Sequence, residues 1–77
     1  MDWVFIGSTA NESFLLNGID IFKKKWEYTS EIATVIDPIY KVKKYFTVWS
    51  VQKDNGEVIL FAAGEFSNCI WGIYTKG

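Results

Sequence analysis

The residues that could support nucleophilic chemistry lie near the C-terminal end of the sequence, where Cys69 follows Glu65 and Ser67. A thiolate needs a neighbouring base or cation to form near neutral pH, and histidine usually fills that role. The chain contains no histidine, and no lysine is adjacent to Cys69. The apolar neighbours of the thiol are instead typical of a buried strand. We therefore predict an inert Cys69 and no catalytic residue.

The same composition excludes most of the sites that small domains use for catalysis or for extra stability. One cysteine cannot form a disulfide within its own chain, and without histidine it cannot build a Cys/His zinc site. The absence of arginine removes the side chain best suited to clamp a phosphate or carboxylate. We predict a non-enzymatic chain with no metal site and no cofactor. Aromatic packing or self-association must then stabilise so small a core.

A different chemistry is suggested by lysines that are interleaved with aromatic residues in two segments of the chain. Lysines that follow a backbone and rings that stack on bases are what proteins use to bind single-stranded nucleic acid. The other interpretation is a solvated strand whose lysines prevent edge-to-edge aggregation. The candidate binding site consists of six residues: Lys24, Trp26, Tyr28, Lys43, Tyr45 and Trp49.

Aromatic residues make up 18% of the chain, which is a large share for one small core. Rings that do not fit inside become exposed anchors, and such anchors are enriched in protein interfaces. The eight basic and nine acidic residues give a net charge of −1, which argues against a surface that attracts nucleic acid as a whole. A protein partner is therefore the leading expectation, with self-association as an extension and single-stranded nucleic acid as the alternative.

Three features bear on where the chain works. No stretch approaches the roughly 18 uninterrupted apolar residues of a membrane span. The first residues, Met1-Asp2-Trp3, lack the basic start of a signal peptide. A single cysteine also favours a reducing compartment. We expect a cytoplasmic protein that makes no contact with a membrane.

The elements that must position these residues are short runs of branched and aromatic residues, separated by glycine, asparagine and the lone proline. This pattern is typical of antiparallel strands joined by turns. Asn55-Gly56 predicts a two-residue type I′ turn between strands at 45–54 and 57–63. After a loop at 64–68, the residues from Cys69 to Thr75 are expected to add a third strand.

The predicted turn fixes a register in which Val51 faces Leu60 and Trp49 faces Ala62. The run from Val58 to Ala63 is apolar at every position, so it would be buried on both of its faces. Such a strand belongs in a closed barrel, in a sheet covered on both sides, or in a dimer. We expect this run, with Leu60 in it, at the centre of the sheet.

The N-terminal third of the chain allows two interpretations. Asn17-Gly18 is a second type I′ signal and predicts a hairpin whose long second strand starts at Ile19 and reaches Tyr28. The segment 9–12 also fits a helix capping box, with Gly18 just past the end of a helix from 10 to 17. The sequence leaves both open.

Taken together, the pattern predicts a single domain, 1–77, that is all-β with one short N-terminal helix as the open alternative. Further strands are expected at 3–6, at 32–36, and near Tyr40 after the Asp37-Pro38 turn. We expect one small antiparallel meander that curls into a barrel of SH3-like or OB-like size, because closure removes exposed edges.

Overall fold

The computed structural model describes residues 2–10, 12–67 and 70–77, and strands dominate them. In chain order the elements are β1 (Trp3–Thr9), β2 (Leu15–Leu16), β3 (Ile19–Asp20), the 3₁₀ turn η1 (Ile21–Lys23), β4 (Glu27–Ile36), β5 (Lys43–Gln52), β6 (Val58–Ser67) and β7 (Ile70–Lys76). The prediction of an all-β antiparallel fold is confirmed.

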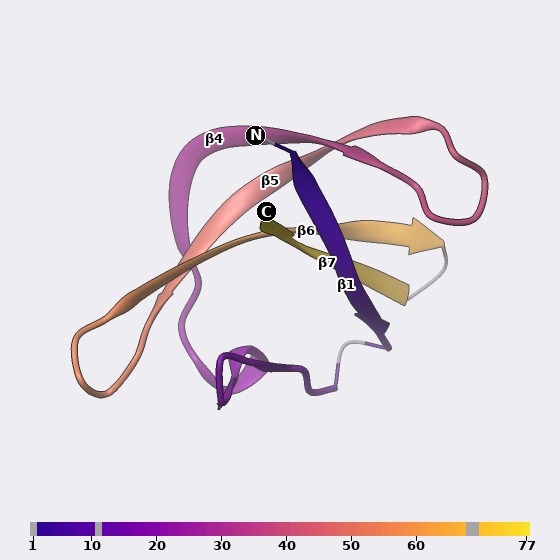
Figure 1. Cartoon of the computed structure of the whole chain (residues 1–77). Coiled ribbons are helices and arrows are strands. Elements are labelled where there is room, and N and C mark those ends of the chain that lie inside the picture. Colours follow the sequence, from indigo (N-terminus) through magenta and orange to yellow (C-terminus); the bar gives the residue numbers. More distant parts are fainter. Residues whose placement is uncertain (1, 11, 68–69) are drawn as a thin grey trace.

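Five of the strands form one antiparallel sheet in the order β1-β7-β6-β5-β4 (Figure 1). β4, β5, β6 and β7 form a meander. The first strand, β1, pairs with the last strand, β7. The short strands β2 and β3 form a separate hairpin. β6 is the middle strand of the sheet, as its apolar run predicted.

The sheet curls strongly but does not close. Its edge strands β1 and β4 approach each other, with some Cα atoms within 8 Å, yet no hydrogen-bonded ladder joins them among the described residues. Closure into an SH3-like or OB-like barrel is therefore not confirmed. The two open edges face each other across a seam.

β4 bends sharply in its first half, as Figure 1 shows. The pairing with β5 shifts between Tyr28 and Ile32, and Ser30 takes a positive φ of 66°. The Thr29 hydroxyl stabilises this irregularity because it donates to the Val48 carbonyl oxygen at 2.7 Å. Irregularities of this kind increase the local twist of a strand. The bend turns the second half of β4 toward β1.

The loop between β5 and β6 has three residues rather than the predicted two. The Lys53 amide donates to the Glu57 carbonyl oxygen at 2.8 Å, and the Gly56 amide donates to the Lys53 carbonyl oxygen at 2.9 Å. Positive φ occurs at Gly56 (91°) but not at Asn55. A turn followed by one glycine in the left-handed region is the common three-residue hairpin loop. The type I′ prediction is therefore wrong here.

The longer loop shifts the whole ladder by one residue, so that Trp49 faces Phe61 and Ser50 faces Leu60. Because side chains alternate between faces, a one-residue shift changes which partner each residue meets. Phe61 is fully buried, whereas Val58 and Leu60 are 58% and 45% exposed. β6 is central in the sheet, but the expectation of a buried Leu60 is wrong.

The N-terminal hairpin is confirmed and the helix from 10 to 17 is wrong. Asn17 and Gly18 have φ values of 51° and 84°, as a type I′ turn requires. The second strand ends early because η1 begins at Ile21. Asp20 caps this turn with its Oδ1 atom, which accepts from the amides of Phe14 and Phe22, each at 3.1 Å. The predicted long strand to Tyr28 is therefore interrupted.

Both faces of the sheet are covered, so its hydrophobic core has two parts. The segment that carries β2, β3 and η1 crosses one face, at the bottom of Figure 1. The buried residues of that part are Leu16, Ile21, Val51, Ile59, Phe61, Ala63 and Ile73. The inside of the curl holds the other part, which consists of Ala33, Val35, Phe46, Val48, Ala62 and Tyr74.

The end of β6 also differs from the prediction. The expected loop at 64–68 is wrong up to Ser67, because β6 continues through these residues. Gly64 allows this, since a Cβ atom there would collide with the Phe46 ring that covers it. β7 confirms the third strand from Ile70 onward, whereas the prediction for Cys69 lies outside the described residues. In the part of the chain that is described, no helix has the length and hydropathy to span a bilayer.

Candidate functional site

The pairing of β4 with β5 brings four of the six candidate residues onto one face of the sheet. Residues directly opposite each other in an antiparallel ladder point to the same side. Tyr28 is opposite Trp49, and Thr34 is opposite Tyr45. We call this side of the two strands the outer face, and it is formed by Tyr28, Ile32, Thr34, Ile36, Lys43, Tyr45, Thr47 and Trp49.

The outer face exposes large apolar side chains. Tyr28 and Tyr45 are 65% and 67% exposed, and Ile32 and Ile36 are 55% and 52% exposed. These four residues belong to two adjacent strands, so they form a continuous strip rather than scattered positions. Contiguous exposed apolar surface on a small domain commonly marks an interaction site.

Trp26, directly before β4, supports this face from one end. Its ring lies 4.8 Å from Phe61, 5.6 Å from Trp49 and 6.1 Å from Trp71 between centroids. Its indole N–H donates to the Ile21 carbonyl oxygen at 2.7 Å. These contacts hold the ring in place, so Trp26 acts as a rigid support for Trp49. The Trp49 ring is in turn 6.0 Å from the exposed Tyr28 ring.

A shallow groove runs from the outer face across β6 to β7. It has a volume of about 390 Å³ and is lined by Tyr45, Phe46, Thr47, Trp49, Ala63, Gly64, Glu65 and Trp71. A smaller hollow of about 250 Å³ is lined by Phe22, Lys24, Trp26 and Trp71. Aromatic rings therefore line both depressions, and Trp71 contributes to each.

The two lysines of the candidate site lie apart from each other. Lys24 lines the smaller hollow beside Trp26 and Trp71, and its Nζ atom lies 2.8 Å from Oδ1 of Asp54. The hydrogen bond and the charge of Lys24 lower the pKa of the Asp54 carboxyl. Lys43 does lie on the outer face, where it is opposite Ile36. The structure thus places Tyr28, Tyr45 and Trp49 on one face with Lys43, and it places Lys24 beside Trp26, where Lys24 is paired with Asp54.

Sequence reasoning missed three residues of this region: Ile32, Ile36 and Trp71. Side chains alternate between faces along Ile32-Ala33-Thr34-Val35-Ile36, and this alternation could have predicted that Ile32 and Ile36 share a face. In the structure Ala33 and Val35 are buried, and their neighbours are exposed. The position of Trp71 depends on the order of the strands, which local patterns do not specify. No motif in the sequence could have placed that ring beside Trp26.

The described residues contain no cluster of three or more His, Cys, Asp or Glu side chains that could hold a metal ion. Comparison with known proteins finds no matching family model, no matching curated protein and no matching solved structure. Function must therefore be argued from the surfaces of this chain alone.

Proposed function

We propose that this chain is a non-enzymatic β domain that binds a protein partner through its outer face. The observation that carries the proposal is the strip of four exposed apolar residues, Tyr28, Ile32, Ile36 and Tyr45, which the β4–β5 ladder aligns on one side. Tyrosine presents a large ring with few rotatable bonds and a polar end, so it contributes strongly to interfaces.

The charges near the strip favour a protein over a nucleic acid. Binding to single-stranded nucleic acid requires several free cations along the path of the backbone. Lys24 is paired with Asp54, which leaves Lys43 as the candidate lysine on the outer face, and Lys44 lies on the opposite face, where it is paired with Asp37 at 3.0 Å. The net charge of the chain is −1. These features support an interface anchored by rings and aliphatic groups, and the single cysteine supports a cytoplasmic location.

Site-specific photocrosslinking in cells tests the proposal. We would introduce a benzophenone amino acid at Tyr45 on the outer face and, as a matched control, at Tyr40 in the β4–β5 turn, which is 75% exposed. A discrete protein adduct is expected from position 45 and not from position 40. Irradiation of a cell lysate at raised salt should give a similar yield of adduct, because an apolar interface is screened little by ions.

Oligonucleotide binding provides the opposing measurement. Fluorescence anisotropy with short labelled DNA and RNA should show no affinity tighter than about 10 μM at physiological salt, a value within the range of non-specific binding. Submicromolar binding that weakens steeply with salt and is lost in Lys43→Glu would replace the proposal with nucleic-acid binding.

In the crosslinking experiment, equal yields of protein adduct at positions 40 and 45 would show that the outer face is not the binding site.

A further inference from the structure

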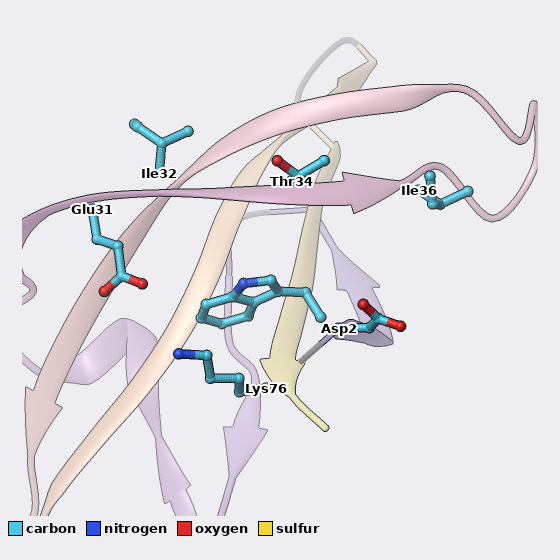
Figure 2. A pocket seen from close by; sticks show the side chains of 7 residues that line it. Asp2, Glu31, Ile32, Thr34, Ile36 and Lys76 are labelled. Carbon is cyan, nitrogen blue, oxygen red and sulfur yellow. The ribbon is translucent and has the colours of Figure 1, made fainter.

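A hollow with a volume of about 600 Å³ lies at the seam between the two edge strands. Figure 2 shows it from close by. One side is formed by β4 through Glu31, Ile32, Thr34 and Ile36, and the other side is formed by residues near the two ends of the chain, namely Asp2, Trp3 and Lys76. We call this hollow, with these seven residues, the seam.

No strand ladder of the described chain forms along the seam, although the Ile36 carbonyl oxygen accepts from the Tyr74 hydroxyl and the Glu31 amide donates to the Thr29 hydroxyl. Within the described residues, β4 pairs with β5 only and β1 pairs with β7 only. A free strand edge offers a row of N–H and C=O groups to another strand, and natural proteins usually protect such edges with lysine or proline. The part of β4 from Ile32 to Ile36 contains neither and has no charged residue. This edge is therefore open to pairing from Ile32 to Val35, up to the Ile36 carbonyl that Tyr74 occupies.

Residues from both faces of β4 line the seam. In Figure 2, Ile32 and Thr34 project on one side of the strand, whereas Glu31 projects on the side of Lys76. The Lys76 ammonium lies 5.7 Å from the centre of the Trp3 ring, so the base of the seam is an indole flanked by charge. A ligand at this edge contacts side chains from both faces of β4. An extended strand can make both sets of contacts, because its successive side chains alternate between faces.

We propose that the seam binds an extended segment of a partner protein, which pairs with the free edge of β4 as an added strand. This inference rests on the proposed protein-binding function and specifies the form of the bound segment. Its residues beside Ile32, Thr34 and Ile36 are aliphatic. Its alternate residues are basic, because Asp2 and Glu31 outnumber Lys76 among the charged groups that line the hollow.

A synthetic peptide tests this directly. The probe is a capped eight-residue peptide that alternates valine and lysine, and the matched control contains the same residues in two blocks. Both carry the same charge, so only the alternation differs. By isothermal titration calorimetry we expect the alternating peptide to bind about tenfold or more tightly than the block peptide, a difference readily measured. Amide hydrogen exchange should slow for residues 32–36 and should not slow in the β5–β6 loop.

Variants and a modified peptide check the geometry. Glu31→Lys should weaken binding of the alternating peptide several-fold, whereas Glu12→Lys, the same charge change far from the seam, should not. Every second amide of the bound peptide faces β4, and the others face away. N-methylation of the amides that face β4 should abolish binding, whereas N-methylation of the other set should leave binding intact. Failure of the alternating peptide to bind, equal binding of the block peptide, or equal effects of the two sets of methylation would overturn the proposal.

The two proposals fail in distinguishable ways. Loss of the crosslink at Tyr45 would remove the outer face as a site and would leave peptide binding at the seam intact. Loss of alternation-dependent peptide binding would remove the seam and would leave the crosslink at Tyr45.

Discussion

The Tyr74 hydroxyl donates a hydrogen bond of 2.7 Å to the carbonyl oxygen of Ile36. Tyr74 lies on β7 and Ile36 ends β4, so the bond crosses the inside of the curled sheet rather than following a ladder. The Tyr74 ring packs edge-on against Phe5 and Phe46, with centroid distances of 5.4 and 5.8 Å. This contact holds the edge strand β4 over the core and thereby sets the width of the seam.

Tyr74→Phe should keep the ring packing and remove this bond. We expect the free energy of unfolding to fall by about 1 to 2 kcal/mol, because the Ile36 carbonyl loses its partner in a partly buried site. Urea denaturation measures the loss, and Tyr40→Phe, at an exposed ring, is the control. Hydrogen exchange near the end of β4 should also accelerate. A loss equal to that of the control would show that the bond does not stabilise the curl.

The same tyrosine predicts how stability changes at high pH. Burial, with a smaller contribution from the charge of Asp37, raises the pKa of Tyr74 to about 12 from its usual value of 10.0. The neutral phenol is thus favoured in the folded state, so this stabilisation is complete below pH 10 and is lost as the pH rises toward 12. Ultraviolet absorbance should show a late phenolate transition. It should be missing in Tyr74→Phe, and its persistence there would contradict the assignment.

Asp37 predicts a loss of stability in acid. Its buried carboxylate accepts from the amides of Ile39 and Tyr40 at 2.7 and 2.9 Å and lies 3.0 Å from the Lys44 ammonium. The bond from Tyr40, more than the other contacts, lowers the Asp37 pKa below 3.8. The stabilisation is present above that value and is lost as the pH falls further.

Urea denaturation at pH 7 and at pH 3 tests this expectation for the β4–β5 turn. Wild-type protein should lose more stability on acidification than Asp37→Asn, because the amide does not titrate. Glu12→Gln, at an exposed position, should behave like the wild type. If Asp37→Asn and the wild type lose the same amount, Asp37 does not contribute to acid denaturation.

The two neighbours Leu60 and Phe61 should respond very differently to truncation. Phe61 is fully buried and touches the Trp26 ring, so Phe61→Ala should cost about 3 to 5 kcal/mol. Leu60 is 45% exposed, and Leu60→Ala should cost less than about 1 kcal/mol. Chemical denaturation of the two variants gives the comparison. Similar losses would mean that the register of β5 with β6 is the one expected from a two-residue turn.

Local patterns in the sequence determined the strand-rich class and the central place of β6, and they indicated the Asn17-Gly18 hairpin as one of two alternatives. These features depend on few residues at a time: positive φ at Asn17 and Gly18, and the apolar run that ends at Ala63. The exposure of Ile32 and Ile36 could also have been read from their alternation with buried neighbours. Each follows from backbone preference or side-chain alternation alone.

Tertiary structure alone decided the register at Gly56, the curl held by Tyr74 and Ile36, and the meeting of Trp3 with β4 across the seam. Gly56 can serve a two-residue or a three-residue loop, so local preference does not choose between them. The choice depends on which ladder buries Phe61 beneath Trp26, and that contact joins residues 35 positions apart in the sequence. Packing between distant segments therefore selects among conformations that the local chain permits equally.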